Sequence, residues 1–214
     1  MSAGAAIGRI IETDACVAEG AEALRGMCPR LADALDLTAP LPLRRRPDGF
    51  AQLLSAIVSQ QVSVASASAI WQRMEAAKLT GPRQIARASD EDLRAAGLSR
   101  QKMRYARELA VAGIDFNGLR DVPDAEVIAT LTRVPGIGVW TAEIYAMFSL
   151  GRADVFAPGD LALQEAARVL YDLPARPTEK ELRQMAEAWR PWRSVAARIL
   201  WAYYRVAKDR EGIR

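Results

Sequence analysis

The residue types in this chain restrict the chemistry that it can perform. The sequence contains no histidine and only two cysteines, Cys16 and Cys28. Histidine bases and nucleophile–histidine pairs are therefore excluded, and two thiols are too few for a four-cysteine zinc site or an iron–sulfur cluster. A reaction at neutral pH would have to use carboxylates, hydroxyls, lysines or bound water.

Asp160 is the strongest candidate for a reacting carboxylate. It follows Pro158-Gly159 and stands at the predicted start of a helix. The helix dipole and the N–H groups of a first turn stabilise an ionised carboxylate at such a position. An isolated aspartate there is more typical of a helix N-cap, so capping and catalysis both stay open. Asp154, the nearest second acid, is predicted to be a turn or capping residue.

A second segment that could take part in function is the turn 134–138, Val-Pro-Gly-Ile-Gly, between two predicted helices. Its two glycines allow a sharp turn that brings backbone N–H groups to the start of the second helix. Such groups bind anions, so the turn predicts a contact with a DNA phosphate that reads no base sequence. A plain connection between two helices is the alternative. The predicted contact residues are Pro135, Gly136, Ile137, Gly138, Val139 and Thr141, with the N–H groups coming from Ile137, Gly138 and Val139.

The elements that must position these residues are predicted to be helices throughout. Apolar residues recur at helical spacing in this chain of 214 residues, and strand-like alternation is rare, so we expect an all-α fold. Three prolines make residues 38–47 a linker. The run of Ser, Val and Ala at 63–69 predicts a helix packed closely on a neighbour, and Trp189 and Trp192 are predicted core residues. The expected helices cover 13–24, 29–35, 50–58, segments capped by Ser63, Ser89 and Ser99, 124–133, 139–150, 160–171, 178–189 and 191–208.

Basic residues are unevenly distributed along the chain. The formal net charge is +3, yet residues 1–40 carry three basic and six acidic side chains, which leaves 26 basic and 20 acidic ones for 41–214. A polyanion would therefore meet the later part. Two runs lack any acidic residue and suit either DNA phosphates or solvent: 93–107, with Arg94, Arg100, Lys102, Arg104 and Arg107, and 189–205, with Arg190, Arg193, Arg198 and Arg205.

Taken in order, four segments resemble the helix–hairpin–helix–Gly/Pro–Asp superfamily of base-excision DNA glycosylases. They are 56–65 (Ala-Ile-Val-Ser-Gln-Gln-Val-Ser-Val-Ala), the turn 134–138 with its flanking helices, 150–160 ending in Asp160, and 189–201 (Trp-Arg-Pro-Trp-Arg-Ser-Val-Ala-Ala-Arg-Ile-Leu-Trp). Within the superfamily the chain looks like the alkylation-repair branch of DNA-3-methyladenine glycosylase II type. The resemblance implies two helical subdomains facing across a cleft: 49–150, bearing the hairpin, and 1–48 joined with 151–214.

The resemblance also implies roles for individual residues. Asp160 would stabilise positive charge on the deoxyribose and orient or deprotonate the attacking water. Gln61 would fill the gap left by a flipped nucleotide. The pocket for the damaged base would be lined by Trp140, Trp201, Gln60 and Ile144, with the two indoles stacking on a cationic base.

Position 140 distinguishes two reaction types in the superfamily. Members with lyase activity carry a lysine there that forms a Schiff base with the sugar, whereas this chain has Trp140. The resemblance therefore implies a monofunctional hydrolase that releases alkylated purines, such as 3-methyladenine and 7-methylguanine, from duplex DNA during base excision repair. An alkylated purine leaves readily, so one carboxylate without a histidine acid is sufficient.

We expect no metal and no cofactor, although the hairpin could hold a monovalent cation. The chain has no long uncharged apolar run and no signal-peptide pattern, so an intracellular, cytoplasmic monomer that acts on damaged duplex DNA and not at a membrane is expected. Three alternatives stay open: a glycosylase for deaminated or etheno-purines, a non-catalytic protein that binds damaged DNA, and a helix-turn-helix regulator.

Overall fold

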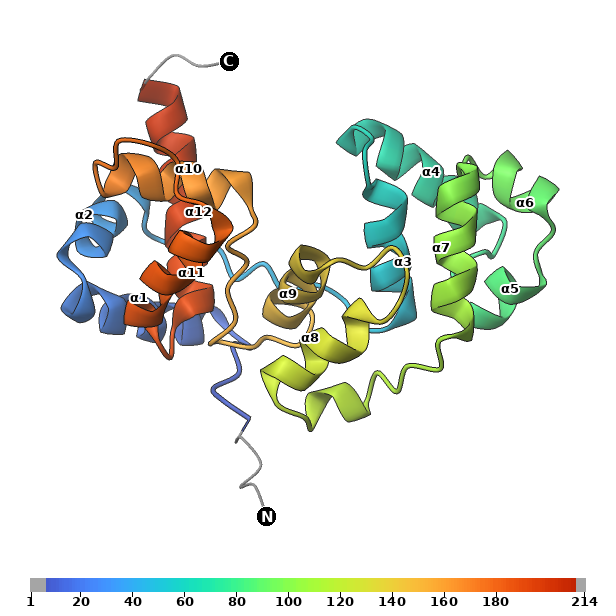
Figure 1. The fold of residues 1–214 in the computed structure, drawn as a ribbon, viewed down its shortest axis with the longest axis horizontal. Coiled ribbons are helices and arrows are strands. Elements are labelled where there is room, and N and C mark those ends of the chain that lie inside the picture. The colour runs from blue at the N-terminus through green and yellow to red at the C-terminus, as the bar shows by residue number, and fades with distance from the viewer. Residues whose placement is uncertain (1–6, 211–214) are drawn as a thin grey trace. The chain divides into compact units, whose positions relative to one another are not determined.

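The computed structural model describes residues 7–210, and over that range the chain is all-α (Figure 1). The β-type pairing described there is a single isolated bridge between Ile10 and Arg152. The prediction of an all-α fold is confirmed. In order, the helices are α1 (Asp14–Met27), α2 (Pro29–Thr38), α3 (Phe50–Ser59), α4 (Val64–Ala76), α5 (Pro82–Arg87), α6 (Asp90–Ala95), α7 (Arg100–Val111), η1 (Gly118–Arg120), α8 (Asp124–Thr132), α9 (Val139–Phe148), α10 (Leu161–Leu170), α11 (Glu179–Ala186), η2 (Glu187–Trp189) and α12 (Arg193–Arg210).

Helix starts follow the capping signals in the sequence. Thr13, Ser63, Ser89 and Ser99 each accept an N–H from the residue three positions later, at the starts of α1, α4, α6 and α7. Ser89 and Asp92 form a capping box. These caps satisfy N–H groups that a helix start leaves without intrahelical acceptors, so short polar side chains fix where each helix begins.

The chain divides into two compact units. Among the described residues, those up to Arg45 and those from Ala146 onward form unit 1, and Arg46–Tyr145 form unit 2. The boundaries expected from the sequence were 48/49 and 150/151, and the second boundary instead falls within α9. No helix in the described residues is both long and apolar enough to cross a lipid bilayer.

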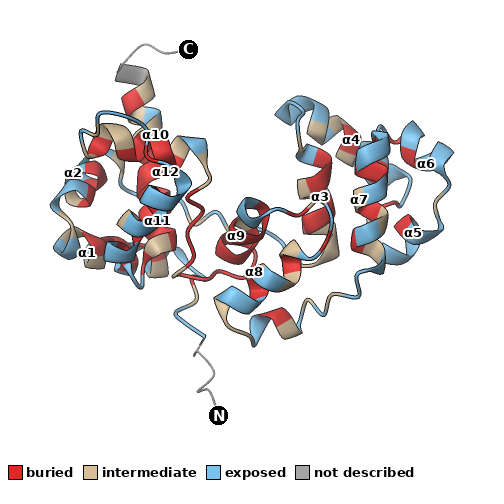
Figure 2. Cartoon of the chain, viewed as in Figure 1, coloured by how far each residue is buried: buried red, intermediate tan, exposed pale blue. Residues whose placement is uncertain are grey.

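Unit 1 is built around α12, which packs against α10, α2 and α1. Buried residues are concentrated on α12 and in the segment that follows α9 (Figure 2). Trp189 and Trp192 are buried, as predicted, and Trp189 packs edge-on against Phe156 with ring centroids 5.4 Å apart. A side chain at Gly20 of α1 would overlap Trp192, so this glycine allows α1 to approach the tryptophan closely.

Unit 2 has a core centred on α3, which packs against both α4 and α7. On α3 the apolar side chains of Leu53, Leu54, Ile57 and Val58 are buried, and that of Phe50 is partly buried. The prediction of a close helix contact at 63–69 is wrong, because most of this segment is exposed and Val64 is 88% exposed. The buried residues of α4 are Ile70 and Met74, since larger apolar side chains gain more from leaving water.

Candidate active site and DNA interface

The predicted hairpin connects α8 to α9 and is anchored by two buried side chains, Val134 and Ile137. The Ile137 N–H donates to the Val134 carbonyl at 3.0 Å, so the turn itself uses a group that we had predicted to contact a phosphate. Gly136 has φ +92°, and a Cβ there would overlap the ring of Tyr105. Both observations explain why this position is a glycine.

Gly138 is different from Gly136, because the fold does not require a glycine there. A Cβ at Gly138 would meet nothing within 4 Å, and the residue is exposed. Pro135 and Val139 are also exposed, whereas Thr141 is buried. The N–H groups of Gly138 and Val139 lie at the N-terminal end of α9, where helix geometry leaves donors for an outside acceptor. The exposed edge of the turn can therefore accept an anion at close range.

The turn after α3 holds the two predicted glutamines in different environments. Gln60 donates its Nε2 to the Gly136 carbonyl at 2.8 Å, which ties this turn to the hairpin. Gln61 is exposed, in the left-handed region at φ +56°. The buried Lys102 donates its Nζ to the Val58 carbonyl at 2.7 Å, and burial lowers the pKa of this amine. Lys102 thus stabilises the end of α3 instead of belonging to an exposed basic face.

The first turns of α9 carry the two other predicted pocket residues of unit 2. Trp140 is 47% exposed, and Ile144, one turn later, is partly buried. An exposed indole of this size presents a flat apolar surface on which a base can stack.

Sequence reasoning missed a polar contact that fixes α9 within unit 2. The Tyr145 hydroxyl donates to Asp48 Oδ1 and accepts the Gly49 N–H at 2.9 Å, while Asp48 also pairs with Arg120. Burial, followed by the hydrogen bond to Asp48, raises the pKa of Tyr145 well above its ordinary value. No sequence signal links position 48 to position 145, because the contact exists only in the folded chain.

Asp160 is the N-cap of α10. Its Oδ1 accepts the N–H groups of Ala162 at 2.9 Å and Leu163 at 3.2 Å, and also the indole N–H of Trp201 at 3.2 Å. The turn before it is held by the buried Gln164, whose Nε2 donates to the Pro158 carbonyl at 2.8 Å. A single oxygen of Asp160 therefore both caps α10 and contacts Trp201, a predicted pocket residue.

Trp201 lies on α12, is partly exposed, and has an aromatic ring and a cation close to its indole. Its ring centroid is 5.7 Å from that of Phe148, at 35° between the planes. The guanidinium of Arg44 lies 5.9 Å from the same tryptophan centroid. The ring is thus in cation–π range of a positive group already present in unit 1.

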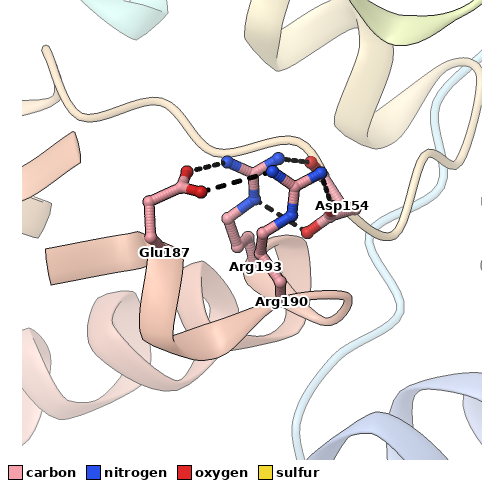
Figure 3. Close-up of polar contacts among 4 residues, drawn as sticks. All are labelled: Asp154, Glu187, Arg190 and Arg193. Carbon is pink, nitrogen blue, oxygen red and sulfur yellow. Dashed lines mark hydrogen bonds and ion pairs between the residues drawn. The ribbon is translucent and has the colours of Figure 1, made fainter. Parts of the chain in front are cut away.

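The basic run at 189–205 is largely used inside unit 1. Arg193 donates to Asp154 Oδ1 at 2.7 Å and to Glu187 Oε1 at 2.7 Å, and Arg190 pairs with the same two carboxylates (Figure 3). Arg198 is 1% exposed. Of the four arginines in this run, Arg193 and Arg198 are therefore withdrawn from an exposed basic face, whereas Arg190 and Arg205 are exposed. Asp154 anchors its turn to Arg190 and Arg193, in line with the structural role expected for it.

In the basic run at 93–107, only some of the five basic side chains are exposed. Arg107 pairs with Asp90 at 2.6 Å and donates to the Ala88 carbonyl, and Lys102 is buried. Within this run the exposed arginines are Arg94, Arg100 and Arg104. Arg104 lies 5.1 Å from the centroid of Tyr105, the ring that abuts Gly136. This part of the run borders the hairpin and can extend a phosphate-binding surface.

Residues 54–191 match the protein family described as HhH-GPD superfamily base excision DNA repair protein, which names the same hairpin and the same Gly/Pro-Asp segment. The chain belongs to this superfamily. DNA-3-methyladenine glycosylase 1 of Schizosaccharomyces pombe is 31% identical over 180 residues, which cover 79% of this chain and 78% of the relative. Within the superfamily, the branch is therefore that of the DNA-3-methyladenine glycosylases.

Two solved structures agree with this assignment. The DNA-3-methyladenine glycosidase of Bacillus halodurans is 36% identical with a TM-score of 0.80, and the match covers 94% of this chain and 95% of that one. The S. pombe 3-methyladenine DNA glycosylase Mag1, solved in complex with abasic DNA, is 29% identical with a TM-score of 0.73, covering 86% of this chain and 95% of that one.

Proposed function

We propose that this chain is a monofunctional DNA glycosylase that hydrolyses the N-glycosidic bond of alkylated purines in duplex DNA. The observation that carries the proposal is the contact between Asp160 and Trp201 in unit 1. It places a carboxylate beside an aromatic ring of the kind that binds a cationic base. The family relationship and the complex of Mag1 with abasic DNA support the same reaction.

The chemistry requires little beyond these two groups. As the glycosidic bond breaks, positive charge develops on the deoxyribose, and an ionised Asp160 stabilises this charge and orients the attacking water. Glycoside hydrolysis more often uses a second carboxylic acid to protonate the leaving group. An alkylated purine already carries a positive charge, so it leaves without such an acid. A reaction without a second acid fits a chain that has no histidine and in which Asp154 forms ion pairs with Arg190 and Arg193.

Unit 2 binds the DNA backbone. The exposed edge of the hairpin binds a backbone phosphate through Gly138 and Val139, and Gln61 fills the space vacated by the flipped nucleotide. The left-handed backbone and the exposed side chain of Gln61 support its proposed role in filling this space. Gln60 supports the hairpin carbonyl, and Gln60, Trp140 and Ile144 in unit 2 and Trp201 in unit 1 are each proposed to contact the damaged base. We further propose that the enzyme acts on DNA as a monomer and without a metal or another cofactor.

Trp140 at the first turn of α9 supports a reaction without a lyase step. A Schiff base needs an amine at the reacting centre, and the position that supplies it in lyases is a tryptophan here. The product is therefore an intact abasic site.

A panel of duplexes tests the proposal. Each would contain one 3-methyladenine, 7-methylguanine, hypoxanthine, 1,N6-ethenoadenine or undamaged purine, and base release would be measured under single-turnover conditions. We expect fastest release of the two alkylated bases, strand breaks only after alkali treatment, and no borohydride-trapped complex. Release restricted to hypoxanthine or ethenoadenine would show that the substrates are deaminated or etheno-purines instead of alkylated ones. Binding without release of any base would show that the protein is a non-catalytic protein that binds damaged DNA.

A further inference from the structure

Arg198 is a buried cation that the reaction proposed above does not use. It lies on α12 with 1% of its surface exposed, and no carboxylate in the described part of the chain forms an ion pair with it. Burial lowers the pKa of its guanidinium to about 10, with Arg44 and Arg45 adding to the shift, so the group stays charged at neutral pH. An apolar side chain would fill the same core position without burying a charge.

The hydrogen bonds of Arg198 join two parts of unit 1 that are far apart in sequence. Nε and Nη2 donate to the Leu43 carbonyl at 3.3 and 3.0 Å, and Nη1 donates to the carbonyl and hydroxyl oxygens of Ser194 at 2.8 and 2.6 Å. The guanidinium therefore fixes the linker immediately before Arg44. Arg44 is the residue whose own guanidinium lies near the Trp201 ring.

The same guanidinium lies 4.8 Å from the centroid of Phe148, and Phe148 is the ring that packs on Trp201. Arg198 and Trp201 are three positions apart on α12, so they are neighbours on the helix surface. Arg198 thus holds both groups that border Trp201, Phe148 directly and Arg44 through Leu43. Trp201 in turn donates its indole N–H to Asp160.

We infer that Arg198 is a positioning residue that sets the orientation of the Trp201 ring and, through its indole N–H, the hydrogen bonding of Asp160. The inference rests on the proposed function, because it assigns Arg198 to that site. It explains why a charged residue occupies a core position: a planar group with several donors in fixed directions can hold a carbonyl and stack on a ring at once.

A double-mutant cycle separates positioning from general stabilisation. Arg198→Met is made alone and together with Trp201→Phe, which retains a ring but lacks the indole N–H. At saturating enzyme we expect Arg198→Met to slow the release of 7-methylguanine by about tenfold or more, because small displacements of reacting groups cost rate. In the Trp201→Phe background the same substitution should have little further effect, because the indole N–H through which Arg198 acts on Asp160 is gone. Arg198→Lys, which keeps the charge but replaces the planar guanidinium by a single ammonium group, should restore part of the rate.

Val195→Ala is the matched control. Val195 is fully buried on the same helix and packs toward Gly20 of α1, so the substitution opens the core without touching the Arg198 contacts. It should lower the melting temperature while the rate, measured well below that temperature, stays close to that of the wild type. If Arg198→Met does not fold, Phe148→Leu, which removes the ring between Arg198 and Trp201, replaces it in the cycle.

A spectroscopic readout keeps the inference testable without activity. The near-UV circular dichroism that disappears in Trp201→Phe belongs to Trp201, and Arg198→Met should abolish most of that same signal, whereas Val195→Ala should not. Equal rate losses in both backgrounds, or an unchanged Trp201 signal in Arg198→Met, would overturn the inference. A wild-type protein that releases no base would instead refute the proposed function, and the spectroscopic comparison would still decide the role of Arg198.

Discussion

Gln60 Nε2 donates to the carbonyl oxygen of Gly136 at 2.8 Å, which joins the turn after α3 to the hairpin. Replacing Gln60 by Met keeps the length of the side chain but removes the donor. We expect a loss of about 1 kcal/mol in the free energy of unfolding, the typical net value of one hydrogen bond. DNA affinity should fall as well, because the hairpin carbonyl loses its support. Urea denaturation and fluorescence anisotropy measure the two effects.

The control for this variant is Gln101→Met. Gln101 donates a hydrogen bond of similar length, 2.7 Å, to the Tyr105 hydroxyl, but both residues belong to α7 and the bond is exposed. Its loss should change stability by less than about 0.5 kcal/mol. Equal effects of the two substitutions would show that the hydrogen bond to the hairpin contributes no more to stability or DNA affinity than an exposed hydrogen bond within one helix.

The two hairpin glycines should respond in opposite ways to substitution by alanine. Gly136→Ala forces a side chain into a left-handed conformation and against Tyr105, so we expect a loss of about 1–3 kcal/mol in stability. Gly138→Ala meets open space and should unfold like the wild type, yet bind duplex DNA more weakly because the new methyl group lies where a phosphate approaches. Gly138→Ala with normal DNA affinity would contradict the proposed phosphate contact.

Arg100 and Arg104 should contribute to the salt dependence of DNA binding. Each phosphate contact that is lost lowers the slope of log K against log salt by about 0.9. We therefore expect Arg100→Gln and Arg104→Gln to reduce the slope, and the double variant to reduce it by about twice as much. Arg190→Gln removes the same charge from a residue bonded to Asp154 and Glu187, and it should leave the slope unchanged. Identical slopes in all variants would exclude the α7 surface from the interface.

Tyr145 should stabilise unit 2 in a pH-dependent way. Its pKa in the folded chain lies above the ordinary value near 10, so the stabilisation is fully present below that pH and is lost as the pH rises toward the folded value. Tyr145→Phe removes a hydrogen bond to the carboxylate of Asp48 and should cost about 1.5–3 kcal/mol at pH 7. Urea denaturation between pH 7 and 11 should show this difference constant up to about pH 9 and smaller above pH 10. A difference that grows with pH would contradict the assignment.

The sequence predicted those features that are encoded locally. Caps at Thr13, Ser63 and Ser99 mark helix starts because the capping bond spans only a few residues. The Pro-Gly-x-Gly turn and the aspartate at a helix start were likewise readable, since backbone conformation at glycine and charge at a helix end are local properties.

Features that depend on folding partners could not be read in the same way. The arginines at 190, 193 and 198 look like a basic surface in the sequence, but folding brings Asp154, Glu187 and the Leu43 carbonyl to them. Asp154 and Leu43 lie far from these arginines in the sequence, so a charge count along the run does not contain them, and Glu187 stands just outside the run. The contact between Tyr145 and Asp48 was missed for the same reason.

Asp160→Asn tests the central claim most directly. Asparagine is also a good N-cap and keeps the Oδ1 that accepts from Ala162, Leu163 and Trp201, so α10 and the affinity for abasic DNA should be preserved. The negative charge is lost, and Oδ2 is replaced by an amide NH2 that donates instead of accepting. In a single-turnover assay with a duplex containing one 7-methylguanine, we expect the rate of base release to fall by about 100-fold or more. Release by a folded Asp160→Asn variant at the wild-type rate would contradict the catalytic role of Asp160.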